Sequence, residues 1–336
     1  MNMMQWIGEM KKAPIKKAMP VLSFPSIQLM DIGVQELIND SSKQATGMKL
    51  IAQRTNSCAS LGMMDLSVEA EAFGSNIRTF DDEVPAVIGS IVDTKEKADA
   101  LIVPNVGAGR TGLYIEAIQK ACQMISDRPV FAGVIGPFSL AGRLMDVSEA
   151  MVYCYDDPGM VHTVLGKVTD FIIAYIQEYK AVGANGVVVA EPLAGLLTPN
   201  MNNEFSVTYM KRIVNAVQTD DFIVVYHNCG GGTPYMVNEI KTIGAAAYHF
   251  GNAVSMLDML QKFPADQIVM GNIDPASQFR NGTPDSIRKA TKDLLEECGG
   301  YSNFVISSGC DIPPLSKWEN IDAFFQTVDA FYANKQ

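Results

Sequence analysis

Short apolar runs alternate with longer amphipathic stretches along almost the whole chain of 336 residues. Several of the short runs are apolar at every position, as in VVVA and FIVVY. A strand of this kind is covered on both faces, which is typical of a parallel sheet surrounded by helices. The strand-like runs are residues 20–24, 58–66, 130–136, 186–191, 222–227, 246–250, 267–272 and 304–309.

The stretches between these runs have the spacing of helices. After Pro158, apolar residues recur every three or four positions as far as Tyr179, and proline suits the first turn of a helix. Thr283 and Pro284 begin a second predicted helix, which the glycine at Gly299 ends.

This alternation constrains the fold class. Eight strands separated by helices, in a chain of this length, predict an α/β protein with a single (β/α)8 TIM barrel. The barrel domain is expected to cover residues 1–336, with a short helical extension, residues 1–19, as an N-terminal arm. A doubly wound sheet is the alternative fold.

Composition excludes several classes of protein. The net charge of -11 argues against binding to nucleic acid, which needs a basic surface. No apolar run is as long as a membrane span, and the N-terminus lacks the apolar core of a signal peptide, so no membrane contact is expected. Six cysteines spread along the chain do not indicate a disulfide framework and favour the reducing cytoplasm.

One apolar run ends in residues that can bind a metal or take part in catalysis. The run in FIVVYHNCGGGTPYM, residues 222–236, leads directly into His227 and Cys229. Residues two apart on a strand lie on the same face, so both side chains should point the same way. The glycines that follow leave room for a close approach to the backbone, and Gly230 and Gly231 are therefore predicted to contact a cofactor.

Other polar residues also stand at predicted strand ends. TIM barrels carry their chemistry at the C-terminal ends of the strands, so Glu191, His249, Asn272 with Asp274, and Cys310 should converge with His227 and Cys229. For His249 a structural role is the preferred interpretation. Two thiolates and an imidazole suit zinc, and three protein ligands leave one position for water or substrate. The sequence thus predicts a zinc site made by the histidine and the two cysteines, with Asn272 among the cofactor contacts.

The donor set indicates a type of reaction. Zinc held by two thiolates is a weak acid toward water, but it binds a further thiol and keeps that thiol deprotonated. This favours thiol alkylation over hydrolysis. Glu191 would be either a fourth ligand that the substrate displaces or the base that takes the thiol proton. The alternative is that the cysteines and the histidine are core residues with no metal.

Several segments resemble a known family. They are MDLSVEAEAFGS (64–75), GVIGPFSLAGRL (133–144), MGNIDP (270–275) and SGCDIPP (308–314). From about residue 20 to the C-terminus the chain resembles the uroporphyrinogen decarboxylase superfamily. Within it, the chain is most similar to the methylcobamide:coenzyme M methyltransferases and related corrinoid-dependent methyltransferases. That branch binds zinc through a His-x-Cys pair and a distant Cys, which His227, Cys229 and Cys310 match.

The resemblance implies the TIM-barrel fold and a methyl transfer. A small corrinoid protein would present the methyl-corrinoid (methylcobamide), and the acceptor would be a thiol such as coenzyme M, or tetrahydrofolate. Two departures from the family concern the acceptor. Glu191 stands where an aspartate is common, and FGNAV (250–254) stands where a segment containing aspartate is usual. No residue can be named that would hold the sulfonate of coenzyme M.

Three alternatives carry less support. Uroporphyrinogen decarboxylation needs arginines for an acidic substrate, yet no arginine precedes Arg54 and the family's Met-Arg-Gln-Ala-Gly-Arg motif is absent. A non-catalytic zinc-binding or corrinoid-protein-binding module is also compatible with the motifs. The G-x-G-x-x-G pattern from Gly107 to Gly112 is interpreted as a loop leading to a helix at 113–125, because Pro104 interrupts the run before it.

Overall fold

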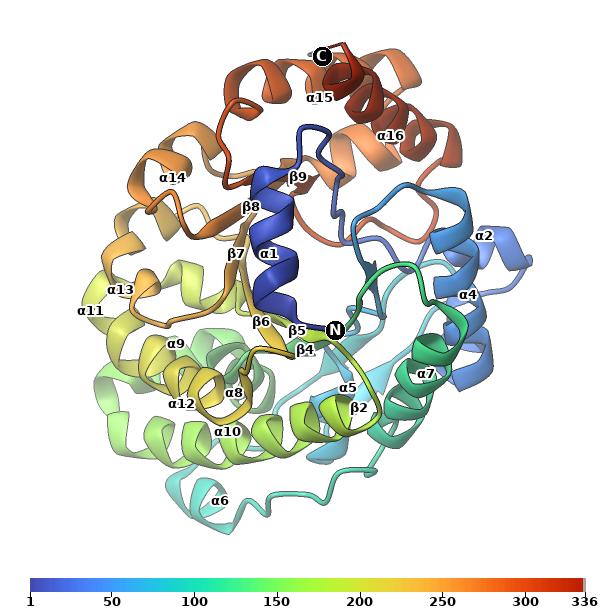
Figure 1. Ribbon diagram of the computed structural model, residues 1–336. Coiled ribbons are helices and arrows are strands. Elements are labelled where there is room, and N and C mark those ends of the chain that lie inside the picture. The colour runs from blue at the N-terminus through green and yellow to red at the C-terminus, as the bar shows by residue number, and fades with distance from the viewer. Residues whose placement is uncertain (335–336) are drawn as a thin grey trace.

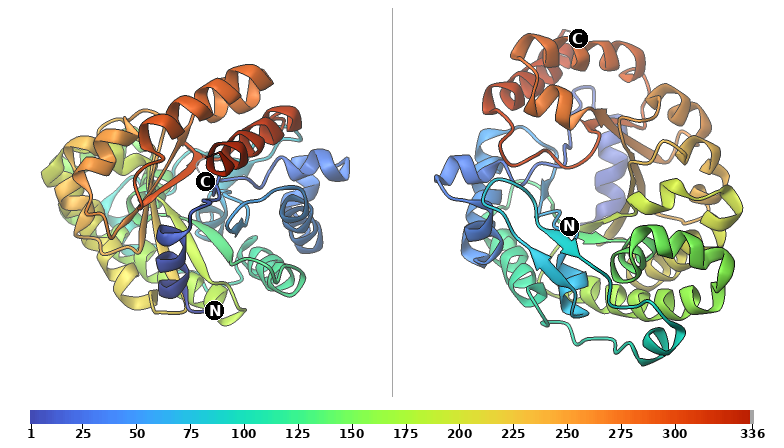
Figure 2. Two further views of the ribbon diagram at one scale, coloured as in Figure 1. Left: turned by 45° about the horizontal axis from the view of Figure 1, so that its top comes forward. Right: turned by 180° about the vertical axis from the view of Figure 1, so that it is seen from behind.

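The structure, a computed structural model, describes residues 1–334. Its main sheet has seven parallel strands that follow one another in chain order, apart from a two-stranded hairpin (β2 and β3) that stands outside the sheet. The strands of the main sheet are β1 (Ser60–Leu61), β4 (Val130–Ile135), β5 (Gly186–Ala190), β6 (Ile223–Asn228), β7 (Ala247–Phe250), β8 (Ile268–Ile273) and β9 (Phe304–Ser308). The sheet curls, and helices surround it (Figures 1 and 2), which confirms the predicted TIM-barrel class.

Helices connect almost every pair of strands. The longer ones are α1 (Met3–Lys12), α4 (Ser41–Arg54), α7 (Thr111–Met124), α8 (Pro137–Met145), α9 (Val147–Asp156), α10 (Pro158–Ala181), α12 (Thr208–Val217), α14 (Met256–Lys262), α15 (Pro284–Cys298) and α16 (Trp318–Ala333). The shorter elements are α2 (Ser26–Met30), α3 (Val34–Ile38), α5 (Val68–Ala72), β2 (Asn76–Arg78), β3 (Ala86–Ile88), α6 (Lys95–Ala100), η1 (Pro192–Leu196), α11 (Pro199–Asn202), η2 (Asn203–Val207), η3 (Thr233–Tyr235), α13 (Val237–Lys241) and η4 (Pro275–Arg280).

The first predicted strand, residues 20–24, is not a strand. The residues directly before it nevertheless bridge the two edges of the sheet. The N–H of Met19 donates to the carbonyl of Ile306 in β9 at 3.0 Å, and the N–H of Cys58, just before β1, donates to the carbonyl of Ala18 at 2.9 Å. An irregular segment therefore stands in the eighth position of the barrel, and the prediction of eight regular strands is corrected to seven.

Proline explains why no ladder forms in this segment. Pro20 has no N–H to donate to a neighbouring strand. The N–H of Val21 donates to the side chain of Ser308, at 3.0 Å, instead of to a backbone carbonyl. The second predicted strand, residues 58–66, is also shorter than expected, because only Ser60–Leu61 pairs with β4.

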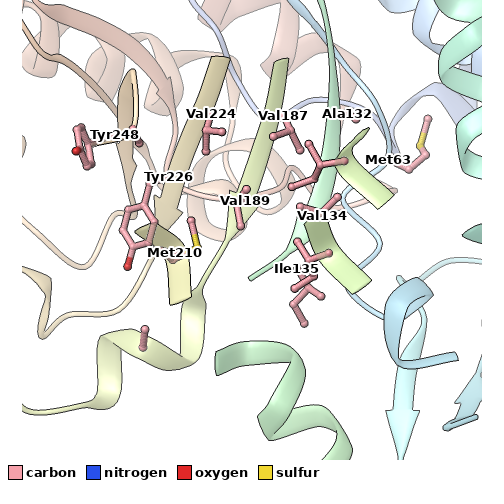
Figure 3. Close-up of a cluster of buried hydrophobic side chains, with 14 of the residues drawn as sticks. Met63, Ala132, Val134, Ile135, Val187, Val189, Met210, Val224, Tyr226 and Tyr248 are labelled. Carbon is pink, nitrogen blue, oxygen red and sulfur yellow. The ribbon is translucent and has the colours of Figure 1, made fainter. Parts of the chain in front are cut away.

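The two faces of each strand serve different layers. In β5 and β6, Val187, Val189, Val224 and Tyr226 belong to the apolar layer beneath the helices (Figure 3). The alternate residues, such as Val188 and Val225, pack in a second apolar cluster inside the barrel. This two-residue period decides which side chains at the strand ends can reach the barrel interior.

Helix α1 covers the N-terminal end of the barrel, and lies across the sheet in Figure 1. Met3 and Ile7 are buried and pack with Ile223 and other interior side chains. The N–H of Met3 donates to the carbonyl of Asp220, which precedes β6. The predicted N-terminal helical extension is therefore present, and it leaves the C-terminal ends of the strands as the accessible end.

Two further predictions concern helices. The glycine-rich pattern forms a loop before α7, and no strand precedes it among residues 101–110, as expected. Helix α10 begins at Pro158, as predicted. It is long and apolar enough to cross a membrane by length and composition alone, but 56% of its most apolar window is buried inside the protein.

Candidate metal centre

His227, Cys229 and Cys310 meet at the C-terminal end of the barrel. His227 lies near the end of β6, Cys229 follows that strand directly, and Cys310 lies two residues after the end of β9. Their ligand atoms all lie within 4.8 Å of one another. No disulfide joins these thiols, and Cys310 Sγ is 3.6 Å from His227 Nε2.

One of these distances fits a tetrahedral ion. With zinc–sulfur and zinc–nitrogen bonds of about 2.3 and 2.05 Å, tetrahedral geometry places sulfur and nitrogen about 3.5–3.6 Å apart. The separation of Cys310 Sγ from His227 Nε2 is 3.6 Å. This one separation is that of two zinc ligands, and the third ligand atom lies close enough to share the ion. The role of the three side chains as ligands stays a prediction.

The strand period explains the direction of His227. Val225 and Ile223, two and four residues before it on β6, are interior residues, so the imidazole also points into the barrel. Backbone packing then places Cys229 beside the next strand. A Cβ on Gly251, just after β7, would lie 2.6 Å from both Cα and Cβ of Cys229, so only glycine permits this approach.

The two thiols perturb each other. A hydrogen bond from Cys310, together with the nearby His227, lowers the pKa of Cys229 well below its ordinary value although burial opposes this. The same contact and burial raise the pKa of Cys310. One sulfur therefore carries negative charge while the other keeps its proton, and a metal cation would favour the loss of that proton.

A chain of hydrogen bonds orients His227 through Nδ1, the ring nitrogen that does not face the sulfurs. His227 Nδ1 lies 2.7 Å from Nδ1 of His249, and His249 Nε2 lies 2.7 Å from Oγ of Ser307. The Ser307 hydroxyl donates to the carbonyl of Met19, also at 2.7 Å. Because this carbonyl only accepts, Ser307 Oγ accepts from His249 Nε2–H.

The direction of this chain fixes both imidazole tautomers. His249 Nδ1 is then an acceptor, and His227 Nδ1–H donates to it, which leaves the lone pair of His227 Nε2 facing the sulfurs. Burial and the neighbouring His227 lower the pKa of His249 well below its ordinary value, so His249 is neutral. Such outer partners commonly orient histidine ligands of metals.

A cavity of about 50 Å³ adjoins the three side chains. Its other lining residues are mostly apolar: Val21, Met64, Leu66, Ala190 and Pro192. The remaining one is Asp311, whose Oδ1 is buried and has no hydrogen-bond partner among residues 1–334. Burial raises the pKa of this carboxyl well above its ordinary value, and the charge of Asp65 adds to the effect.

Glu191 has a different environment from the one expected. It follows Val187 and Val189 in the two-residue period of β5, and these residues face the helices. Its Oε1 accepts the N–H groups of Phe138 at 2.8 Å and Ser139 at 3.3 Å, at the N-terminus of α8. The carboxylate thus caps a helix, and it does not line the cavity.

Both oxygens of the Glu191 carboxyl group accept hydrogen bonds from the protein. Its Oε2 accepts the hydroxyl of Ser206 at 3.2 Å. Burial raises its pKa to about 8, although these hydrogen bonds oppose the shift. The structure brings the predicted catalytic glutamate into the wall of the barrel, so its role as ligand or base stays a prediction without support from this geometry.

Two of the three predicted cofactor contacts, Gly230 and Asn272, are used by the protein itself. A Cβ on Gly230 would lie 2.6 Å from Cα of Gly195, so the close approach allowed by glycine is made by a neighbouring loop. Gly231 follows in the same loop. Asn272 Nδ2 donates to the carbonyls of Gly251 and Val254, at 2.9 and 2.8 Å. Contact of any of these three with a cofactor stays a prediction.

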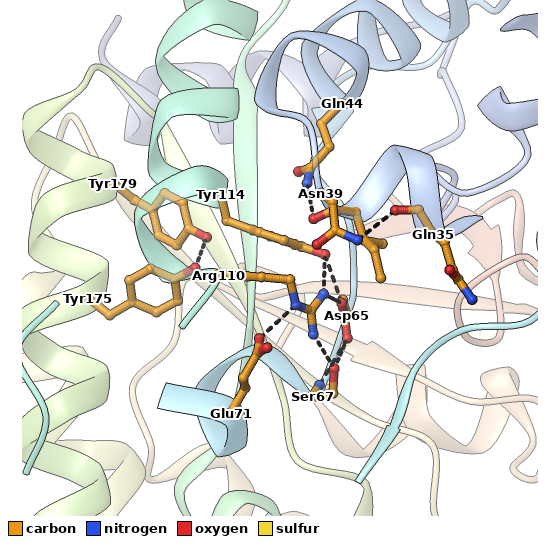
Figure 4. A network of polar contacts seen from close by, with 11 residues as sticks. Gln35, Asn39, Gln44, Asp65, Ser67, Glu71, Arg110, Tyr114, Tyr175 and Tyr179 are labelled. Carbon is orange, nitrogen blue, oxygen red and sulfur yellow. Dashed lines mark hydrogen bonds and ion pairs between the residues drawn. The ribbon is translucent and has the colours of Figure 1, made fainter. Parts of the chain in front are cut away.

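A buried ionic network stands near the end of β1 (Figure 4). Arg110 pairs with the carboxylates of Asp65 and Glu71, and Tyr114 and Ser67 donate hydroxyls to Asp65. Sequence reasoning did not identify this network. The signal available to it was slight, because Arg110 is one arginine in a glycine-rich loop.

The sequence places His249 at a predicted strand end but favours a structural role for it, and Asp311 was missed as a member of the site. The pairing of β6 with β7 places His227 directly opposite His249. In the sequence both histidines end apolar runs, which was the only indication of their contact. Asp311 follows Cys310 directly, but nothing in its local sequence shows that one of its oxygens is buried without a partner.

A family comparison agrees with this geometry. The family model of uroporphyrinogen decarboxylase (URO-D) matches residues 16–331. The chain belongs to the URO-D family. This confirms the resemblance found in the sequence, and the match covers the barrel from the irregular first segment to α16.

Relatives within this family have different names. A methylcobamide:CoM methyltransferase, MtbA, of Methanosarcina acetivorans is 28% identical over 262 residues, 76% of this chain and 75% of the relative. A uroporphyrinogen decarboxylase of Christiangramia forsetii is 26% identical over 247 residues, 71% and 70% of the two chains. A solved methyltransferase structure from Methanosarcina mazei shares the fold, with a TM-score of 0.86, 22% identity and 98% coverage of both chains.

Proposed function

We propose that the protein is a zinc-dependent methyltransferase that moves a methyl group from a protein-bound methyl-corrinoid to an acceptor, a thiol such as coenzyme M or tetrahydrofolate. The observation that carries the proposal is the meeting of His227, Cys229 and Cys310 beside a cavity at the C-terminal end of the barrel. Similarity to the Methanosarcina acetivorans methyltransferase supports it. Zinc bound by these residues would keep an acceptor thiol deprotonated near neutral pH.

The protein's own residues would prepare the transfer. Two thiolates and one neutral imidazole would hold the metal, and His249 keeps His227 in the tautomer that offers Nε2. The apolar lining of the cavity limits water around the acceptor. During transfer the bond from the acceptor to the methyl carbon forms as the cobalt–carbon bond breaks, and both electrons of that bond remain with the corrinoid substrate.

Exposed apolar side chains beside the site support docking of a corrinoid protein. Leu196, at the end of η1, is 65% exposed, and Tyr235, in η3, is 81% exposed. The loops that carry them touch, because a Cβ on Gly232 would lie 2.6 Å from the carbonyl oxygen of Gly195. Both loops follow strands that end at the cavity, so we assign this rim to a small corrinoid protein in a reducing cytoplasm.

The decarboxylase alternative fits the cavity less well. An acidic tetrapyrrole needs cationic partners. Among the residues described, none of those lining this cavity is lysine or arginine. Arg110 is committed to Asp65 and Glu71. The donor set of the cavity therefore favours methyl transfer over decarboxylation.

The proposal is tested with the zinc-loaded protein, methylcobalamin, and a panel of thiols and tetrahydrofolate. Zinc content is measured, and demethylation is followed in the cobalt spectrum. Cys310→Ser should bind less zinc and abolish transfer. Cys122→Ser is the matched control, because Cys122 lies on α7 outside the ligand group and should leave both quantities unchanged.

Each alternative has its own result. A fully zinc-loaded Cys310→Ser protein with normal turnover would contradict the ligand assignment. Stoichiometric zinc in the wild type without methyl transfer to any acceptor would favour the non-catalytic module. Consumption of uroporphyrinogen by the wild type would favour the decarboxylase.

A further inference from the structure

We propose that the corrinoid protein docks through acidic side chains, and that Arg143 and Lys262 bind them. The two cations lie beside the loops that carry the exposed apolar rim at Leu196 and Tyr235. In the proposed methyl transfer, on which this inference rests, that rim receives the protein that carries the methyl-corrinoid. The partner's surface therefore combines an apolar patch with carboxylates next to it.

Helix α8, which carries Arg143, lies at the same end of the barrel as the candidate metal site. It begins directly after β4, whereas α10 is the helix that packs against β4 and against the neighbouring helices α7 and α12. Helix α8 instead contacts α5 and η1, which follow the C-terminal ends of β1 and β5. It is thus an addition at the C-terminal end of the barrel, placed before the helix of the outer layer.

Arg143 is the one residue of α8 that is not buried, and it opens to solvent beside η1. Its neighbour Gly142 packs on this loop, because a Cβ there would lie 2.5 Å from Cδ1 of Leu193. One turn earlier, the hydroxyl of Ser139 accepts the N–H of Leu193 at 3.2 Å. Side chains on a helix lean toward its N-terminus, so the guanidinium is directed toward the strand ends. The same loop carries Leu196 at its end.

The guanidinium of Arg143 has no hydrogen-bond or ion-pair partner among residues 1–334. The nearest acid along the chain, Asp146, accepts the N–H groups that begin α9 instead. Apart from the exposed Arg78, every other arginine pairs with an acid or donates to a backbone carbonyl. Arg143 is partly buried, and a guanidinium in such a place usually has an anionic partner. Its planar group of donors suits a carboxylate, which it binds through two parallel hydrogen bonds.

Lys262 supplies a second positive charge, at the other loop of the rim. Its Nζ donates to the carbonyl of Pro234 at 2.9 Å, directly before the exposed Tyr235. A cavity of about 230 Å³ opens here, and Tyr235, Lys241 and Lys262 are among its lining residues. Among the residues described, none of those lining this cavity is acidic. Cations next to exposed apolar side chains thus set this rim apart in a chain with a net charge of -11.

The anion belongs to the carrying protein and not to the corrinoid itself. The methyl group projects from the face of the corrinoid ring that is turned to the acceptor, and the phosphodiester of the nucleotide loop hangs from the opposite face. A cation on the rim therefore meets the protein around the edge of the ring. Complementary charges speed encounter and fix orientation, which matters for an acidic chain that would otherwise repel an acidic partner.

The test compares two methyl donors, a methylated corrinoid protein that the wild type demethylates and free methylcobalamin. kcat/KM is measured with zinc-loaded wild type, Arg143→Gln, Arg143→Lys, Lys262→Gln and the double glutamine variant, at ionic strengths of about 0.05 and 0.5 M. Arg212→Gln is the matched control. Arg212 is an arginine on α12 that already pairs with Asp170, and its replacement should change neither donor's kcat/KM.

With the corrinoid protein at low ionic strength, kcat/KM should fall about 10–100-fold in Arg143→Gln, as expected for loss of a charged hydrogen bond. It should fall about 2–5-fold in Lys262→Gln, whose ion pair is more exposed. Arg143→Lys keeps the charge but not the paired hydrogen bonds, so it should recover part of the loss. High ionic strength should lower kcat/KM of the wild type and narrow its lead over the variants. With methylcobalamin all the proteins should agree within about 3-fold.

An unchanged kcat/KM of the double variant with the corrinoid protein, or a wild type that is indifferent to ionic strength, would overturn the acidic docking surface. Equal losses with both donors would overturn it as well, because the two cations would then act on the transfer itself. Failure of zinc-loaded wild type with methylcobalamin and every acceptor would instead reject the methyltransferase. If Arg143→Gln does not fold, Lys262→Gln and the ionic-strength dependence of the wild type decide, since Lys262 is exposed on a different helix.

Discussion

His227 and His249 face each other across neighbouring strands with their Nδ1 atoms 2.7 Å apart. Strand pairing sets this contact, because the two residues are partners in the register of β6 and β7. Both are buried, and the second imidazole is held in turn by Ser307. The orientation of the proposed ligand His227 thus depends on a residue that would not touch the metal.

This pair predicts a change in zinc affinity. His249→Leu removes the acceptor for His227 Nδ1–H and should weaken zinc binding about 10–100-fold, the usual effect of losing such a partner. His249→Gln should recover much of the affinity, because its amide can accept from His227 and donate to Ser307. Competition with a chromophoric chelator measures both. Equal affinity in the leucine variant and the wild type would contradict the orienting role.

Glu191 provides a second prediction, on stability. Glu191→Ala leaves the N–H groups of Phe138 and Ser139 at the start of α8 without their acceptor, so the free energy of unfolding should fall by about 1–3 kcal/mol. Glu191→Gln keeps one acceptor oxygen and should cost less. Urea unfolding of the metal-free proteins measures this. Loss of zinc from a Glu191→Gln protein of unchanged stability would identify Glu191 as a ligand instead.

The same carboxyl predicts a dependence on pH. Burial raises the pKa of Glu191 from an ordinary 4.5 to about 8. The folded protein therefore keeps this proton to higher pH than the unfolded chain does, so its contribution to stability declines as pH rises from about 4.5 to about 8. Glu191→Gln should be favoured over wild type increasingly across this range. A stability difference independent of pH would show that the carboxyl is not buried as described.

The exposed apolar rim at Leu196 and Tyr235 predicts a variant that impairs turnover of a protein-bound methyl donor but not of a free one. Replacing Leu196 and Tyr235 together by serine should lower kcat/KM for a methylated corrinoid protein about 10-fold or more, because such anchors commonly carry binding energy. Turnover of free methylcobalamin should not change. The matched control is Tyr155→Ser, because Tyr155 is 71% exposed on α9. Equal loss with both substrates would place the effect in the cavity instead of the docking surface.

Much of the fold was predictable because it rests on local patterns. Fully apolar runs alternating with helical spacing specify a parallel sheet covered by helices, and Pro158 and Thr283 mark helix starts that the structure confirms. Pro20 was an available signal against a strand at 20–24, since proline cannot donate to a ladder. An apolar run that contains proline is therefore not enough to predict a paired strand.

The candidate metal site likewise has features that the sequence indicates and features that only the tertiary structure shows. The two-residue period already indicated that His227 and Cys229 share a face. Because β5 and β6 are apolar on both faces, the sequence could not say whether that face, or the face of Glu191, is the barrel interior. Only the tertiary structure decided that Cys310 comes within 3.6 Å of His227, that His249 supplies its partner, and that one oxygen of Asp311 is buried without one. A strand's alternation is local and can be read along the chain, whereas the meeting of strand ends depends on how the whole sheet closes.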